Sequence, residues 1–366
     1  MNFVSEQFVV FLLAAWLIFA VVPSKLRWLI LLIASYVFYA SWSFPFIAVI
    51  LLTTSIDYFC SKWIHQSASP AFRKNLLFGA IFANLLVLGL FKYFNFFLDT
   101  QATFAKMLGI ASPLPQHLEI LLPLGISYYT FEAISYLIDV YRGMKPAPNW
   151  LIYNFYIMYF PHLICGPIIR FDLMWAQYKD SIRLPSWDRF AQGLELIVLG
   201  YAFKTIIANN CALVADPVFA NPKAVTVLMT YVATMAFTAQ LYFDFLGYTH
   251  IARGVSLLFN IELPKNFAHP ANAGNYSEFW QRWQITLSQW LNDYLFRPLG
   301  GARKSLPRTS LNIFITFLVA GVWHGAGWTY VVLGLFFGTV VSGYHIFRRF
   351  RKKLLGVNER KIIANP

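Results

Sequence analysis

Charge is scarce in this sequence. Asp, Glu, Lys and Arg make up only 12% of the 366 residues, whereas 58% are hydrophobic, and soluble domains usually carry about twice that charged fraction. Apolar runs recur from Phe8 to His345 and leave no stretch of ordinary domain size between them. The composition therefore excludes a soluble fold and predicts an all-α polytopic membrane protein.

Cysteine is scarce as well. Cys60, Cys165 and Cys211 are odd in number and far apart, and each lies in an apolar run. This spacing excludes a disulfide framework and a zinc site, so we expect three small buried hydrophobic side chains and no bound metal. The chain also lacks a Gly-x-Ser-x-Gly elbow, a phosphate loop and any internal repeat, which disfavours a serine hydrolase and, more weakly, a secondary transporter.

Acidic residues are outnumbered, since 29 Lys and Arg face 16 Asp and Glu, a net charge of +13. The excess lies in short loops and the tail, which favours a role in membrane orientation over nucleic-acid binding. Lys25 and Arg27 follow the first apolar run, and Lys62, Arg73 and Lys74 follow the third. This alternation predicts a periplasmic N-terminus and a cytoplasmic C-terminus.

The apolar runs of near-spanning length predict about 9–11 transmembrane or re-entrant helices. The first run follows Glu6 and has no basic region before it, which predicts an anchor rather than a cleaved signal peptide. We expect one membrane-embedded domain over residues 1–347 and a basic cytoplasmic tail over 348–366. The candidate runs are residues 7–22, 28–42, 44–61, 75–98, 119–141, 151–169, 190–212, 224–247, 309–327 and 329–347.

The sixth run does not fit the alternation, because basic residues flank both of its ends. Pro161, Gly166 and Pro167 lie in its centre and would interrupt a helix. We therefore predict a broken or re-entrant segment. Irregular backbone at membrane depth is tolerated where protein buries it or where it lines a cavity, so this break also indicates an internal site.

Residues 279–295 carry a second pattern, typical of an amphipathic helix. One predicted face holds Phe279, Trp280, Trp283, Leu287, Trp290, Leu291, Tyr294 and Leu295, and the opposite face holds Gln281, Gln284, Ser288 and Asn292. We call these last four residues the polar stripe. Either the helix lies in the membrane interface, or it enters the protein and the polar stripe lines a cavity.

Ionisable residues within apolar runs are costly unless they are paired or functional. The set is Asp57, Glu132, Asp139, His162, Glu195, Lys204, Asp244 and His324. Glu132 and Asp139 share a helix face and are expected to pair with a cation such as Lys204 or to bond backbone groups. Asp57, near a span end, is expected to be solvated or paired. His324 can act as a general base or hydrogen-bond across helices.

Four segments, in order, resemble the membrane-bound O-acyltransferase family, specifically its bacterial branch with alginate O-acetyltransferase and the D-alanyl transferase of teichoic acid. They are Tyr159 to Phe171 (YFPHLICGPIIRF), Tyr242 to Gly254 (YFDFLGYTHIARG), Leu263 to Gly301 and Gly321 to Trp328. The third is the most specific, with PKNF, EFWQRW, LSQWLNDYL and PLGG in succession. The resemblance covers most of the chain, from Leu32 to about His345.

This resemblance implies a ring of helices around a central tunnel that holds His324, the family's signature histidine. There a neutral imidazole would take the proton of an acceptor hydroxyl as it attacks a thioester carbonyl. Gln284 stands where the bacterial branch usually has a second histidine. It is expected to orient the substrate or support the oxyanion, and the alternative is an altered or inactive enzyme.

The resemblance also points to residues of the tunnel or the donor site. These are Asp244, Tyr248, Arg282, Trp283, Ser288, Asn292 and Trp323. Gln281 and Asn292 replace residues that are commonly Arg in the family, which leaves Arg282, Arg297 and Arg303 for a phosphate-bearing donor. Asp244 can equally be a structural residue paired across helices.

The function implied is transfer of an acyl group, expected to be acetyl, from a cytoplasmic thioester to a hydroxyl of an envelope polysaccharide such as alginate. The donor would be acetyl coenzyme A or an acyl carrier protein, with no bound cofactor. The expected partners are the inner-membrane bilayer of a bacterium and a periplasmic acyltransferase, not nucleic acid. The alternatives are a transporter or flippase, and a non-catalytic scaffold. Longer relatives add helices, so a short or truncated member is expected.

Overall fold

The computed structural model describes residues 1–111, 118–164, 166–221 and 225–355. In these ranges every regular element is helical, and the expected all-α class is confirmed. The chain separates into two compact units, one of Met1–Val87 with Leu122–Phe267 and the other of Leu88–Leu121 with Ala268–Pro366. Two expectations, on Cys165 and on the tail beyond residue 355, lie outside the described residues.

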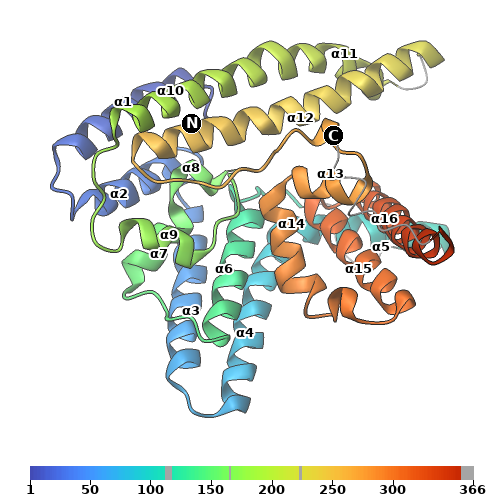
Figure 1. The fold of residues 1–366 in the computed structure, drawn as a ribbon, viewed down its shortest axis with the longest axis horizontal. Helices are drawn as coiled ribbons and strands as arrows, with labels where there is room; N and C mark the ends of the chain where they lie inside the picture. The colour runs from blue at the N-terminus through green and yellow to red at the C-terminus, as the bar shows by residue number, and fades with distance from the viewer. Residues whose placement is uncertain (112–117, 165, 222–224, 356–366) are drawn as a thin grey trace. The chain divides into compact units, whose positions relative to one another are not determined.

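The first unit contains most of the helices (Figure 1). They are α1 (Glu6–Val21), α2 (Arg27–Ala40), α3 (Phe46–Gln66), α4 (Pro70–Leu88), α6 (Ile126–Tyr141), α7 (Trp150–Met158), α8 (Phe160–Leu163), α9 (Phe171–Tyr178), α10 (Trp187–Ala202), η2 (Phe203–Ala208), α11 (Asn209–Ala220) and α12 (Val227–Leu258). The second unit contains η1 (Gly89–Tyr93), α5 (Phe94–Met107), η4 (Pro270–Asn272), α13 (Tyr276–Arg282), α14 (Ile285–Leu291), η5 (Asn292–Phe296), η6 (Gly301–Arg303), α15 (Leu306–His324) and α16 (Trp328–Leu355).

Within the described residues, 5 helical stretches are long and apolar enough to cross a membrane. They are Phe46–Gln66, Pro70–Met107, Trp187–Ala220, Leu306–His324 and Trp328–Leu354, and two shorter apolar helices are Glu6–Val21 and Arg27–Ala40. Their number confirms a multi-pass membrane protein. Two of the long stretches contain π-helical turns, η1 and η2, where the sequence alone predicted uniform spans.

The sixth apolar run is interrupted, as predicted. Helix α7 ends at Met158, and Tyr159 takes φ −51° and ψ 106° before the single turn of α8 begins. Inside the break, Nδ1 of His162 lies 3.1 Å from Oε1 of Glu132, and the Ile169 N–H donates to the same oxygen over 3.3 Å. Of the two kinds of partner expected for Glu132, the backbone group is confirmed, and its side-chain partner is His162 rather than Lys204.

Two other acids of the apolar runs also have partners. Asp57 lies mid-helix in α3, is 1% exposed, and accepts hydrogen bonds from Asn84 and Tyr153 at 2.6 Å and 3.2 Å. It is therefore paired rather than solvated, and its predicted place near a span end was wrong. Asp139 lies 3.6 Å from the guanidinium of Arg142, one turn away on its own helix.

Helices α10 and α12 lie side by side in the first unit (Figure 1). Glycines allow their backbones to approach closely, since a Cβ added to Gly200 would lie 2.7 Å from the Gly247 carbonyl and one added to Gly193 would lie 2.9 Å from the Gly254 carbonyl. Small residues at such contacts are typical of helix packing in membranes, where van der Waals contact replaces the hydrophobic effect.

The predicted amphipathic helix over residues 279–295 is not continuous, and this expectation was wrong. Trp283 is extended and Gln284 adopts the left-handed conformation, with φ 42° and ψ 57°. Helix α13 ends before them, and α14 begins after them with Gln284 as its N-cap. Aromatic and apolar residues continue at helical spacing on both sides of the break, from Phe279 and Trp280 on α13 to Leu287 and Trp290 on α14. Periodicity alone therefore did not reveal the break.

Candidate active site

The second unit encloses a cavity of about 580 Å³, within the range usual for small-molecule sites. Helices α13 and α14 with η5 form one wall, and α15 and α16 form the other. The cavity is lined by Ser277, Trp280, Gln281, Gln284, Ile285, Leu287, Ser288, Gln289, Leu291, Asn292, Phe296, Ile313, Thr316, Phe317, Ala320, Gly321, His324, Leu333, Gly334, Phe337 and Val341. His324 and Gln284, the two predicted catalytic residues, therefore line the same cavity.

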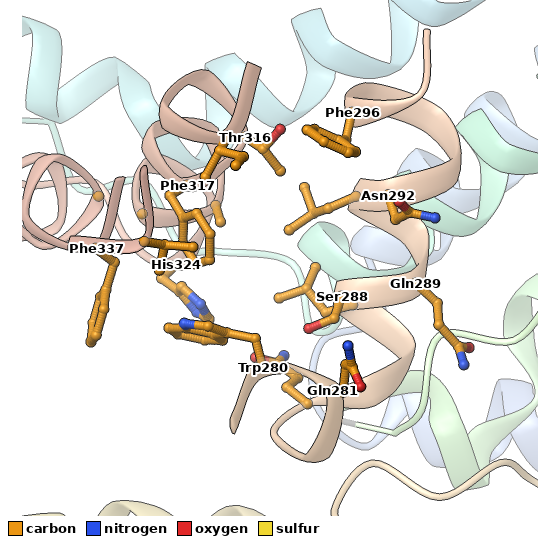
Figure 2. A pocket seen from close by; sticks show the side chains of 18 of the residues that line it. Trp280, Gln281, Ser288, Gln289, Asn292, Phe296, Thr316, Phe317, His324 and Phe337 are labelled. Carbon is orange, nitrogen blue, oxygen red and sulfur yellow. The ribbon is translucent and has the colours of Figure 1, made fainter. Parts of the chain in front are cut away.

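His324 is the last residue of α15, and its side chain is accessible at the cavity wall. Gly325, extended at φ −163° and ψ 156°, ends the helix directly after it. Figure 2 shows the imidazole projecting from α15 into the space that Trp280 and Ser288 also face. Its ring centroid lies 5.1 Å from that of Trp323, which is buried behind it. The ring is thus supported on one side and open to the cavity on the other.

Gln284 is buried, at 4% exposure. Its backbone is in the left-handed conformation, which residues other than glycine rarely adopt. Such a conformation costs about 1–2 kcal/mol and tends to occur at functional sites. Within the described part of the chain, neither Gln284 nor His324 makes a side-chain hydrogen bond that would occupy its polar atoms. Amide and imidazole are both available to a bound substrate.

All four residues of the polar stripe line the cavity. Gln284, Ser288 and Asn292 follow one another at intervals of four, which places them on one helical face. Thr316 contributes a hydroxyl from α15 on the facing wall (Figure 2). The sequence left two alternatives for the polar stripe, exposure at the membrane interface or a place in a cavity. The structure has the second.

Aromatic rings close the rest of the cavity. The centroid of Trp280 lies 5.0 Å from those of both Phe317 and Phe337, each in an edge-to-face arrangement. These three rings come from three different helices and pack at the spacing that aromatic pairs prefer. These rings make one side of the space in front of His324 apolar, and an apolar lining strengthens electrostatic interactions there.

Other predicted site residues lie next to the cavity without lining it. Trp283 stacks on Phe279, with centroids 5.6 Å apart and 15° between the rings. Arg282 pairs with Glu278, and the Gly274 N–H and this guanidinium together hold the pKa of the Glu278 carboxyl below its ordinary value. Trp323 is buried, and its carbonyl accepts a hydrogen bond from Lys92.

Asp244 and Tyr248 belong to the first unit. The Lys204 ammonium pairs with the Asp244 carboxylate across two helices and lies 5.0 Å from the centroid of the Tyr248 ring. The structural reading of Asp244, a residue paired across helices, is the one that this contact matches. Arg297, one of the residues considered for a phosphate-bearing donor, lies 3.2 Å from Asp293 on its own helical turn.

Several cavity residues were not predicted. Thr316 and Ala320 line the cavity at intervals of four before His324, and Gly334, Phe337 and Val341 line it from α16. The signal for the first two was present, because residues at intervals of four share a face with a known site residue. For α16 the pattern was hidden, since a helix that is apolar all round does not reveal which face is buried.

The comparison with known proteins decides which family this site represents. The model of the membrane-bound O-acyltransferase family matches residues 49–365. The chain belongs to this family. The family resemblance first seen in the four segments is thus confirmed, and the matched range includes every residue of the cavity.

Individual relatives within the membrane-bound O-acyltransferase family carry different names. The chain is 39% identical to the probable alginate O-acetylase AlgI of Pseudomonas aeruginosa, over 100% of this chain and 68% of the relative. It is 34% identical to the peptidoglycan O-acetyltransferase of Helicobacter pylori, over 89% and 65%, and 28% identical to the teichoic acid D-alanyltransferase of Bacillus subtilis, over 75% and 69%. The chain therefore spans about two thirds of the length of these relatives.

Proposed function

We propose that this chain transfers an acetyl group from a thioester donor to a hydroxyl group of an envelope polysaccharide, with His324 as the general base. One observation carries the proposal: His324 and Gln284 line one cavity, and both leave their polar atoms open to it. The names of the O-acetylating relatives support the acetyl group and the carbohydrate acceptor.

The chemistry needs one base and one donor of hydrogen bonds. A nitrogen of the neutral His324 imidazole takes the acceptor's hydroxyl proton while the hydroxyl oxygen attacks the thioester carbonyl. The carbonyl oxygen becomes an oxyanion, and the Gln284 amide N–H donates to it. The intermediate then collapses, the C–S bond breaks, and the imidazolium returns the proton to the departing thiolate. The acetyl ester forms, and the free thiol leaves.

The remaining parts of the proposal concern the donor, the partners and the membrane. The donor is acetyl coenzyme A or an acetylated carrier protein that enters from the cytoplasmic side, and no bound cofactor takes part. A periplasmic acyltransferase receives the acetyl group or completes its transfer to the polysaccharide. The chain lies in the bacterial inner membrane with its N-terminus in the periplasm and its C-terminus in the cytoplasm.

Transport without chemistry is less well supported. A transporter would need the acids of its apolar runs to be available to the cargo. Asp57, Glu132, Asp139 and Asp244 each have a partner, respectively Asn84 with Tyr153, His162, Arg142 and Lys204. In the cavity, by contrast, the His324 imidazole and the Gln284 amide have no hydrogen bond to another described residue, which fits acyl transfer better.

The test measures ester-linked acetate on envelope polysaccharide from cells that lack the gene. We expect complementation with the wild type to restore the acetate and His324→Ala to leave it absent, at equal abundance in the membrane. Full restoration by His324→Ala would overturn the role of the imidazole. If the wild type restores no acetate, the proposal that acetyl is the transferred group, or that an envelope polysaccharide is the acceptor, would be overturned.

A further inference from the structure

The carboxyl end of α15 carries His324 and has an unusual set of partners. The last carbonyls of an α-helix have no partner within the helix, so other groups must satisfy them. A left-handed glycine often does so, but Gly325 is extended here. At this end, side chains of the π-helical turn η1 take that role.

Two consecutive residues of η1 supply the donors. The Lys92 ammonium donates to the carbonyl of Trp323, and the Tyr93 hydroxyl donates to the carbonyl of Val322 over 2.8 Å. Lys92 Nζ also lies 5.5 Å from the centroid of the Trp323 ring. A cation at this position is favoured by the negative end of the helix dipole. π-Helical turns are uncommon in proteins and often occur at functional sites.

The turn that follows His324 is also held from its other side. The ring of Phe96, on α5, lies 5.6 Å from that of Trp328, the first residue of α16. A Cβ added to Gly325 would lie 2.1 Å from the Tyr330 ring, so this ring fills the space beside the turn. The backbone before and after the histidine is therefore fixed by η1, α5 and α16, all in the same compact unit.

We propose that Lys92 and Tyr93 are positioning residues, which hold the end of α15 so that the His324 imidazole points into the cavity. This inference rests on the proposed function for its catalytic consequence. The two bonds hold the carbonyls of the two residues directly before His324. A misplacement of a catalytic group by about 1 Å can cost a factor of about 100 in rate, so losing either bond lowers the rate of the chemical step.

The kinetic test uses the purified full chain in vesicles, with acetyl coenzyme A as donor and unacetylated alginate oligosaccharide as acceptor. For Lys92→Met and Tyr93→Phe we expect kcat to fall about tenfold or more while the KM for acetyl coenzyme A changes less than about twofold. Lys92→Arg keeps a charged donor and should recover most of the rate. Lys106→Met, an exposed lysine on α5, is the matched control and should match the wild type.

A kcat of Lys92→Met and Tyr93→Phe within twofold of that control would overturn the proposal. A kcat for Lys92→Arg as low as that of Lys92→Met would also overturn it, because the positive charge and the hydrogen-bond donor at position 92 would then have no effect on the rate. If Lys92→Met does not fold, Tyr93→Phe decides, since it removes only one hydroxyl.

A second readout does not depend on the proposed substrates. Modification of His324 by diethyl pyrocarbonate, followed by mass spectrometry, reports how the imidazole is held. We expect a several-fold change in its rate in Lys92→Met and Tyr93→Phe, with no change at the exposed His65. A wild type without acetyl transfer would contradict the proposed function alone, whereas an unchanged rate at His324 in both variants would contradict the positioning role.

Discussion

The Nδ1 atom of His162 lies 3.1 Å from Oε1 of Glu132, and the two side chains are 1% and 2% exposed. This contact joins α6 to the broken segment between α7 and α9, far from where the sequence suggested a partner for Glu132. Gly166 packs directly against His162, since a Cβ added to Gly166 would lie 2.2 Å from the Cα of His162. A larger residue at position 166 would therefore displace the histidine. The pair thus fixes an irregular backbone that protein buries.

Glu132→Ala leaves a buried imidazole without its carboxylate. Breaking a buried pair from one side costs about 3–5 kcal/mol, so we expect the melting temperature of the purified protein to fall clearly. Glu119→Ala, at an exposed acid, is the control and should not change it. Equal melting of the two variants would contradict the role given to the pair.

Gln284 offers a way to separate folding from activity. Its left-handed backbone is free of strain only in glycine, so Gln284→Gly should keep the free energy of unfolding within about 1 kcal/mol of the wild type and still lower acetyl transfer at least about tenfold. Gln284→His introduces the histidine that the family resemblance leads us to expect at this position, and this variant should remain active. Retained activity in Gln284→Gly would exclude the amide from the mechanism.

Variants of the Lys204 and Asp244 pair test whether this contact is structural or takes part in the activity. Removing one charge leaves the other unpaired in an apolar region, which costs about 2 kcal/mol. We therefore expect Asp244→Asn to lower thermal stability and to leave the acetyl-transfer rate per folded molecule unchanged. Exchange of the two charges, Lys204→Asp with Asp244→Lys, should recover stability. A loss of specific activity in the stable exchanged variant would favour a direct role for the acid.

The contact between α15 and α16 depends on glycine. A Cβ at Gly321 would lie 2.6 Å from the Cα of Gly334, whereas one at Gly343 on α16 meets nothing within 4 Å. Gly321→Ala should destabilise the protein by about 1–3 kcal/mol through overpacking. Gly343→Ala should stabilise it by up to about 1 kcal/mol, because alanine favours the helix. Thermal unfolding of the two variants side by side checks the opposite signs.

The sequence allowed some of these features to be predicted, for physical reasons. The break at Tyr159 and the choice of His324 as a site residue follow from local rules, since prolines interrupt helices and an ionisable group in an apolar run is costly unless it is paired or functional. The break at Gln284 did not follow, because no proline or glycine marks it. A left-handed glutamine is stabilised by tertiary contacts that local propensity does not contain.

The partners of buried groups were the hardest to predict. That Glu132 would meet His162, or that Lys92 would bond the carbonyl beside His324, depends on contacts between residues distant in the chain. Periodicity gives the face of a helix but not the helix that covers it. The cavity residues of α16 were missed for the same reason.

The base at His324 is the central claim, and His324→Gln tests it most directly. Glutamine keeps hydrogen-bonding capacity but cannot accept a proton at neutral pH. With purified protein in vesicles, acetyl coenzyme A and alginate oligosaccharide, we expect the initial rate of acetyl transfer to fall by about 100-fold or more, while His65→Gln retains the wild-type rate. A rate for His324→Gln within about twofold of that control, from protein that is folded to the same extent, would contradict the account.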